Sequence, residues 1–279
     1  MEQRLIFLDI DGTLLIPGQG IRPCVCEGLM KARANGHRIF ICTGRALHEL
    51  PKELEAVKPD GVIASAGSDI WLHGENVYRT WIEPSKLCQI MQLLEELDAI
   101  YLLEGFDQIY VSENGSGMFL DDEPIPDNNP ELISWKAFLS RLENVKHIRC
   151  WHLKKQHIPK ITFMLWGSEK VELLRKTLQE QFDVAVFPQE AAAFFHGEVI
   201  PKAANKGTAI HKTAEILGVD FQKTVAFGDS MNDYQMIEQA AVGIVMENGD
   251  EKLKAIADRV CESVWEDGVI RELERMQVI

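Results

Sequence analysis

The stretch LIFLDIDGT, residues 5–13, joins a short apolar run to two carboxylates and a glycine turn. The run from Leu5 to Leu8 is typical of a strand that is buried on both faces, as in a parallel sheet covered by helices. Asp9 and Asp11 follow this run with only Ile10 between them. Because two neighbouring carboxylates repel each other, we expect a cation or a basic side chain to face them.

Two later segments repeat the pattern of an apolar run that ends in a polar turn: HRIFICTGR at residues 37–45 and KTVAFGDSMND at residues 223–233. Residues 60–72 contain a further apolar run that predicts another strand. Helix-like stretches separate these runs, and one of them, residues 23–36, ends in Asn35-Gly36, a suitable C-cap. This alternation predicts an α/β fold with a doubly wound, mostly parallel, Rossmann-like sheet. Ligands of such sheets bind at the carboxyl ends of the strands, where these polar turns are expected to lie.

The middle of the chain has a different pattern, which predicts an α+β domain inserted into the α/β domain. Helices and short strands alternate there, with a loop rich in Pro, Asp and Asn at residues 121–131. Glu83-Pro84 and Ile200-Pro201 mark its borders and are suited to act as hinges. We therefore expect a core domain made of residues 1–82 and 201–279 and an inserted domain made of residues 83–200.

The composition argues against several classes of partner. The 279 residues include 43 acidic and 29 basic side chains, which gives a formal net charge of -14. Such a surface repels phosphate backbones, so we expect no nucleic-acid partner. No apolar run reaches the roughly 18 residues of a membrane helix, and the first residues lack a signal-peptide pattern. We therefore expect a cytoplasmic protein that does not associate with membranes. The six cysteines lack C-x-x-C spacing and are expected to be reduced packing residues.

The polar residues of the turns, together with one lysine, predict a site for a phosphoryl group. If the sheet is as predicted, Asp9 and Asp229 lie at the ends of neighbouring strands and face one pocket. Carboxylates gathered in this way raise each other's pKa unless a cation intervenes. Oxygen ligands without His or Cys favour a hard ion such as Mg²⁺. The candidate residues of this site are Asp9, Asp11, Thr43, Lys206, Asp229 and Asp233.

The spacing of Asp9 and Asp11 suits two successive chemical steps. Side chains at positions i and i+2 share one face of an extended strand. We predict that Asp9 attacks phosphorus in line, while Asp11 protonates the leaving oxygen and later removes a proton from water. Gly12 permits the sharp turn that follows them.

Four short stretches resemble the motifs of the haloacid dehalogenase-like hydrolases: DIDGTL (residues 9–14), CTGR (42–45), NKG (205–207) and GDSMND (228–233). The chain is most similar to the Cof-type sugar-phosphate phosphatases, whose large α+β cap lies between the second and third motifs. The resemblance covers essentially the whole chain, and it implies that the inserted domain is a cap that sets substrate specificity. It also implies that Asp9 is the nucleophile that forms an aspartyl-phosphate.

The same resemblance implies which residues bind the phosphoryl group. Thr43, Gly44 and Lys206 would bind it during transfer, and Asn232 would contact it. For Arg45 two interpretations stay open, an ion pair at the surface or a contact with the substrate or the cap.

The resemblance further implies a Mg²⁺ site. Asp9, Asp229 and the backbone carbonyl of Asp11 would hold the ion, with Asp233 in or just behind the metal shell. The chain departs from the family at Ala66-Gly67, where many relatives have Asn-Gly. This difference concerns the orientation of the substrate rather than the chemistry.

Together these features predict a Mg²⁺-dependent phosphoric monoester hydrolase. We expect its substrate to be a small phosphorylated metabolite, either a sugar phosphate or a phosphorylated cofactor precursor, and we expect a monomer or a homodimer. A phosphomutase would use the same acids, but its usual cap is smaller, helical and inserted elsewhere. A receiver domain of signalling proteins lacks an acid two residues after its phospho-accepting Asp. A non-catalytic metabolite-binding regulator on the same fold is a further alternative, against which the presence of Asp9 and Asp11 argues.

Overall fold

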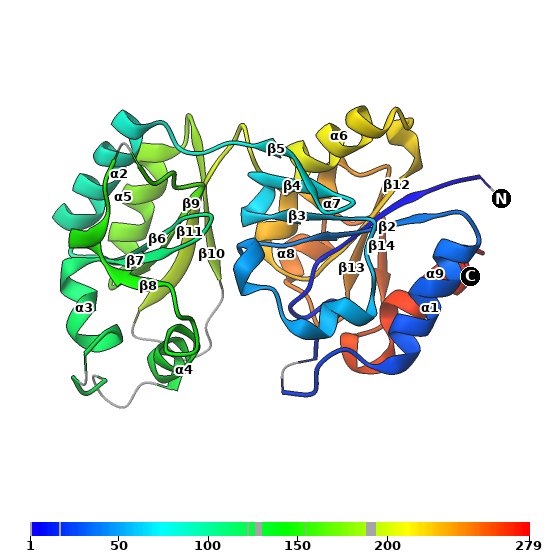
Figure 1. The fold of residues 1–279 in the computed structure, drawn as a ribbon, viewed down its shortest axis with the longest axis horizontal. Helices are drawn as coiled ribbons and strands as arrows, with labels where there is room; N and C mark the ends of the chain where they lie inside the picture. Colours follow the sequence, from blue (N-terminus) through cyan, green and yellow to red (C-terminus); the bar gives the residue numbers. More distant parts are fainter. Residues whose placement is uncertain (1, 17, 122, 126–129, 154, 188–193) are drawn as a thin grey trace. The chain divides into compact units, whose positions relative to one another are not determined.

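The computed structural model of the chain is shown in Figure 1. It describes residues 2–16, 18–121, 123–125, 130–153, 155–187 and 194–279. The chain divides into two compact units, of which the first contains Met1–Arg45, Leu50–Thr80 and Ala203–Ile279. The second contains Ala46–Glu49 and Trp81–Lys202. Within the described ranges, no helix combines the length and the apolar character that crossing a membrane requires.

Among the described residues, the first unit is built on an eight-stranded sheet with the order β14-β13-β12-β1-β2-β3-β4-β5. The strands from β14 to β3 are parallel, and β4 and β5 extend the sheet in antiparallel fashion. The strands are β1 (Leu5–Leu8), β2 (Arg38–Cys42), β3 (Gly61–Ala64), β4 (Asp69–Leu72), β5 (Glu75–Arg79), β12 (Thr224–Gly228), β13 (Val242–Met246) and β14 (Arg259–Cys261). The α-helices are α1 (Pro23–Ala34), α6 (Lys206–Leu217), α7 (Tyr234–Gln239), α8 (Glu251–Lys254) and α9 (Gly268–Arg275).

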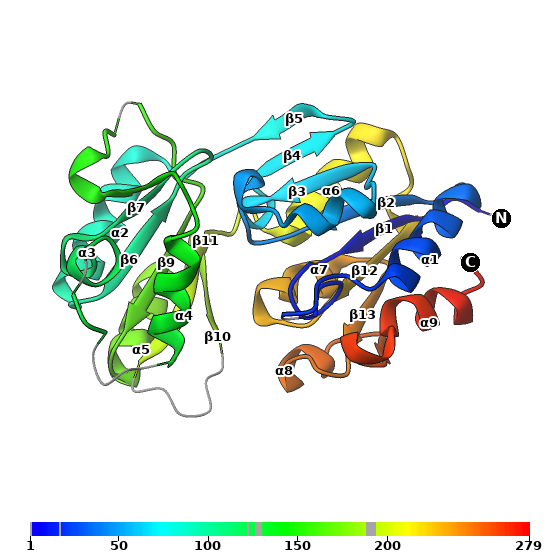
Figure 2. The same cartoon turned by 60° about the horizontal axis from the view of Figure 1, so that its bottom comes forward.

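Helices cover both faces of this sheet, so alternate side chains of a strand enter two separate cores. Ile6 and Leu8 of β1 pack in the core that contains residues of α1 and α9, whereas Leu5 and Phe7 pack with residues of α6 and α7. The helices α1 and α9, from opposite ends of the chain, lie side by side (Figures 1 and 2). The predicted doubly wound, mostly parallel sheet is therefore confirmed, and it explains why the run before Asp9 is entirely apolar.

Residues 60–72 form two strands instead of the single strand expected from the sequence. A short 3-10 turn, Ser65–Gly67, reverses the chain, so that β3 and β4 pair in antiparallel fashion. All three turn residues have positive φ, namely 50° at Ser65, 55° at Ala66 and 108° at Gly67. The Ala66 amide donates a hydrogen bond to the Thr43 carbonyl at 3.0 Å. The turn is thus tied to the segment that follows β2.

The second unit has its own six-stranded sheet among the described residues, with the order β10-β11-β9-β6-β7-β8. All neighbouring pairs are antiparallel except β7 and β8. The strands are β6 (Ile100–Glu104), β7 (Ile109–Val111), β8 (Val145–His147), β9 (Lys160–Leu165), β10 (Phe182–Phe187) and β11 (Phe195–Pro201). The α-helices are α2 (Pro84–Glu96), α3 (Glu113–Phe119), α4 (Pro130–Leu139) and α5 (Ser168–Leu178).

Two hydrophobic clusters lie on the two faces of this second sheet. Tyr101 and Phe163 belong to the cluster that contains residues of α2 and α5, and Leu102 and Met164 belong to the one that contains residues of α3 and α4. The unit therefore has a core of its own, as an α+β domain requires.

Candidate active site

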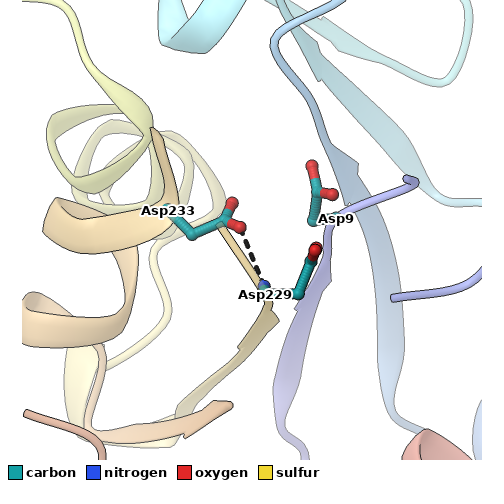
Figure 3. Close-up of side chains that lie close together, drawn as sticks. All are labelled: Asp9, Asp229 and Asp233. Carbon is teal, nitrogen blue, oxygen red and sulfur yellow. Dashed lines mark hydrogen bonds between the residues drawn. The ribbon is translucent and has the colours of Figure 1, made fainter. Parts of the chain in front are cut away.

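The predicted reactive residues follow strands that are neighbours in the core sheet. β1 pairs with β12 on one side and with β2 on the other. Asp9 and Asp229 directly follow β1 and β12, so both lie at the carboxyl edge of the sheet. One carboxylate oxygen from each of Asp9, Asp229 and Asp233 lies within 4.8 Å of the other two (Figure 3). The structure thus brings together three of the four predicted acids.

Lys206 is fully buried and joins this group of acids. Its Nζ atom donates hydrogen bonds to Asp9 Oδ1 at 2.7 Å, to Asp233 Oδ1 at 2.6 Å and to Asn232 Oδ1 at 3.3 Å. Lys206 is the first residue of α6, and the side chain of Asn205 caps that helix. The cap fixes the direction of the first turn, and with it the origin of the lysine side chain. Distant parts of the sequence therefore meet at one ammonium group.

Asp233 is completely buried, and both of its carboxylate oxygens accept hydrogen bonds. Its Oδ1 accepts from Lys206, and its Oδ2 accepts from the backbone amides of Asp229 at 3.0 Å and Ser230 at 3.1 Å. A side chain at Gly228 would collide with Asp233, which explains the glycine at the end of β12. Asp233 precedes α7 but does not cap it with its side chain. Instead it holds Lys206 and the turn after β12 in place.

Burial and mutual repulsion shift the pKa values of this cluster. Burial raises the pKa of Asp9 to about 7, although the Lys206 charge opposes the shift. Burial, together with the charges of Asp9 and Asp233, raises the pKa of Asp229 to about 9. Burial disfavours the charged form of Lys206, but the carboxylates of Asp233 and Asp9 outweigh it and raise the lysine pKa well above its usual range. Three carboxyl groups thus share one ammonium, and the raised pKa values show that Asp9 and Asp229 favour their neutral forms without a further cation.

The carboxylate of Asp11 points to a different partner, Arg45. Arg45 donates from Nε to Asp11 Oδ2 and from its Nη2 to Asp11 Oδ1, both at 2.7 Å. The Asp11 side chain is 51% exposed, in contrast to the buried Asp9. Arg45 thus forms an ion pair with Asp11 in this structure.

The two remaining predicted phosphate-binding residues, Thr43 and Gly44, follow β2 directly. Thr43 is buried, and its Oγ1 accepts a hydrogen bond from the Arg45 amide at 3.1 Å. Gly44 lies in the bend between Thr43 and Arg45. The segment therefore lies beside the end of β1, as the sheet order requires.

Two further side chains hold the turn that follows Asp11. Thr13 Oγ1 donates a hydrogen bond to Asp229 Oδ1 at 3.1 Å, and Asn248 Nδ2 donates to the Gly12 carbonyl at 2.9 Å. Gly12 has a φ of +84°, and a Cβ atom there would lie 2.3 Å from Asp229 Oδ2. Only glycine fits this position. Asn248 escaped the sequence analysis, because an Asn-Gly pair between strand and helix signals only a turn.

Comparison with known proteins gives consistent results. Residues 6–273 match the sequence model of the family described as haloacid dehalogenase-like hydrolase. The chain is 27% identical to the pyridoxal phosphate phosphatase YbhA of Escherichia coli strain K12, with 93% of each chain covered. It is 26% identical to the 5-amino-6-(5-phospho-D-ribitylamino)uracil phosphatase YitU of Bacillus subtilis strain 168, over 97% of this chain and 96% of the relative. The solved structure of the subclass IIB sugar phosphatase BT4131 has the same fold, with a TM-score of 0.79, 23% identity and coverage of 99% of this chain and 100% of that one.

Proposed function

Because the chain belongs to the haloacid dehalogenase-like hydrolases, we propose that it is a phosphatase that hydrolyses a small phosphorylated metabolite. The relatives YbhA and YitU are named for pyridoxal phosphate and for a phosphorylated ribitylaminouracil, and BT4131 is named a sugar phosphatase. These names support a substrate that is a sugar phosphate or a phosphorylated cofactor precursor. The residues of the second unit are the proposed source of substrate specificity.

The observation that carries the proposal is the meeting of Asp9, Asp229 and Lys206 at one edge of the sheet. A buried ammonium 2.7 Å from a carboxylate gives a phosphoryl group a positive partner next to a nucleophile. A non-catalytic regulator would not need the nucleophile, and a structural ion pair would not need the third carboxylate.

The donor set of this site also fits Mg²⁺. All of its ligand atoms are oxygens, and one oxygen from each of the three carboxylates lies within 4.8 Å of the other two. Burial and mutual repulsion raise the pKa values of Asp9 and Asp229, an effect that a bound divalent cation would oppose. We propose that Asp9, Asp229 and the backbone carbonyl of Asp11 hold the ion, while Asp233 supports the site from behind through Lys206. When bound, Mg²⁺ would neutralise charge on the phosphoryl group.

The side chains then have separate tasks in the proposed reaction. Asp9 Oδ1 accepts the hydrogen bond from Lys206, which leaves Oδ2 to attack phosphorus and form an aspartyl-phosphate. Asp11 protonates the leaving oxygen and afterwards takes a proton from the water that hydrolyses the intermediate. Arg45 donates to both Asp11 oxygens in this structure, and each oxygen keeps a further lone pair for a proton. Thr43, Gly44 and Asn232 would contact the oxygens of the phosphoryl group.

The test is phosphate release from p-nitrophenyl phosphate by the purified protein, with and without Mg²⁺. We expect turnover that requires Mg²⁺ and that is lost in Asp9→Asn. Analysis of the products separates hydrolysis from a phosphomutase reaction, because a mutase returns the phosphoryl group to its substrate. No release from a broad panel of phosphate esters with Mg²⁺ present would favour the non-catalytic regulator.

A further inference from the structure

A second buried lysine, Lys160, lies in the other unit at the start of β9. β9 runs between β6 and β11, and the register pairs Lys160 with Glu104 and Thr162 with Glu198. Lys160 Nζ lies 2.8 Å from Glu104 Oε2 and donates a hydrogen bond to Glu198 Oε1. Each of these four residues is at most 7% exposed. Three adjacent strands thus gather one ammonium and two carboxylates in the interior of the second unit.

The two carboxylates of this cluster differ in how many of their oxygens have a hydrogen-bond or ion-pair partner. Glu104 uses both oxygens, since Oε1 accepts a hydrogen bond from the Thr162 hydroxyl and Oε2 faces Lys160. Glu198 Oε1 accepts from Lys160, but its Oε2 is buried and accepts no hydrogen bond from any described residue. Burying a carboxylate oxygen without a donor destabilises a fold. Lys160 is paired with one oxygen of each glutamate, so the ion pairs leave Glu198 Oε2 unused.

The surroundings of the cluster add negative charge to it. The buried Glu49, which also belongs to the second unit, acts electrostatically on both Lys160 and Glu104. Burial raises the pKa of Glu104 to about 7, with the charges of Glu49 and Glu198 contributing and that of Lys160 opposing. Burial lowers the pKa of His196 to about 4, so its imidazole is neutral at pH 7. This part of the unit therefore attracts hydrogen-bond donors and cations and repels carboxylates.

We propose that Glu198, held in place by Lys160, is a recognition site for the hydroxyl or amino groups of a small-molecule ligand. The ligand's donor completes the hydrogen bonding of Glu198 Oε2. The donor group can belong to the non-phosphate part of the substrate or to a separate effector molecule. Where it is the substrate, the inference rests on the proposed phosphatase function. A ligand with a carboxylate in place of the donor binds more weakly, because the cluster already carries surplus negative charge.

The first experiment compares substrates in Glu198→Gln, which keeps the shape of the side chain and removes its charge. The quantity measured is kcat/KM for glucosamine 6-phosphate and for glucose 6-phosphate, each divided by kcat/KM for p-nitrophenyl phosphate. Loss of a charge-assisted hydrogen bond predicts that this ratio falls by about tenfold or more, mainly through KM. The matched control is Glu172→Gln on the exposed surface of α5, which should leave the ratio unchanged.

The second experiment uses free glucosamine to test whether the ligand is a separate effector. If the ligand is an effector, glucosamine changes the rate of p-nitrophenyl phosphate hydrolysis and raises the Tm of the wild type, and both responses are lost in Glu198→Gln. If the wild type is inert toward every ester yet shows this Tm response, the recognition site stands and the proposed function fails. If Glu198→Gln leaves the substrate ratio unchanged and glucosamine does not alter the Tm of the wild type, the proposal is overturned and Glu198 belongs to a structural ion pair alone.

Discussion

Each unit of the molecule buries a lysine between two carboxylates, and the two sites differ in what surrounds the ion pair. Lys206 donates to Asp9 and Asp233, and the carboxylate of Asp229 lies close to both acids. Lys160 is paired with Glu104 and with Glu198 Oε1. The other oxygen of that carboxylate, Glu198 Oε2, accepts no hydrogen bond from a described residue. Buried ion pairs are weak sources of stability, because removing two charges from water offsets most of their attraction. The surplus oxygens are the basis of the two proposals made above, metal and phosphate binding in one unit and ligand recognition in the other.

The largest expected effect is on catalysis, which we assign to the site around Lys206 only. Asp9→Asn keeps an oxygen that can accept from Lys206 but removes the nucleophile. We expect turnover of p-nitrophenyl phosphate to fall by about 10⁴-fold or more, with the fold retained. The exposed Asp107→Asn changes the net charge equally and serves as the control. Substantial activity in Asp9→Asn would contradict the assignment of the nucleophile.

Removing each lysine compares the two sites directly. Lys206→Met and Lys160→Met each leave buried carboxylates without their cationic partner, so each should lower the free energy of unfolding by about 3–5 kcal/mol. Mg²⁺ should reduce the loss in Lys206→Met, because it neutralises Asp9 and Asp229, but not in Lys160→Met. The measurement is denaturant unfolding with and without Mg²⁺. If the loss relative to the wild type in Lys206→Met is the same with and without Mg²⁺, the ion does not neutralise the carboxylates that Lys206 pairs with.

The acids around Lys206 also predict how the stability of the metal-free protein depends on pH. The pKa values of Asp9 and Asp229 are raised from an ordinary 3.8 to about 7 and about 9. At a pH between the ordinary and the raised value of each carboxyl, the folded state therefore binds more protons than the unfolded state. The free energy of unfolding should therefore fall as pH rises from about 4 to 9, by up to about 1.4 kcal/mol per pH unit for each carboxyl.

Glu104 contributes in the same direction, because its pKa is raised to about 7. Asp229→Asn separates the two sites, since only the contribution of the cluster around Asp9 should shrink. Mg²⁺ at a hundred times its Kd should flatten the profile and add about 2.7 kcal/mol at neutral pH. A profile that rises from pH 4 to 9 in the metal-free protein would contradict the raised carboxyl pKa values.

The site around Lys206 was predictable from the sequence because its residues stand where strands and a helix begin or end. Asp9 and Asp229 follow apolar runs, and the order of a doubly wound sheet places such runs side by side. An ion pair of Arg45 was one of the two interpretations that the sequence allowed, but Asp11 as its partner was not predictable, because that choice depends on side-chain rotamers. The pairing of Lys160 with Glu198 was equally hidden, since it depends on the register between strands that are distant in the sequence.

The smallest predicted effect contrasts the turn after β3 with a helix of the second unit. Ala66 has φ 55° and ψ 28°, a left-handed conformation that costs an alanine roughly 1 kcal/mol and glycine almost nothing. Ala66→Gly should therefore raise the free energy of unfolding by about 0.5–1 kcal/mol, whereas the same change at the exposed Ala137 of α4 should lower it by a similar amount. Thermal unfolding measures both shifts. Because the Ala66 amide is bonded to the Thr43 carbonyl, kcat of the stabilised variant decides whether this strain serves the site. A lower kcat would mean that the strained turn positions Thr43, and an unchanged kcat would mean that the turn only joins two strands.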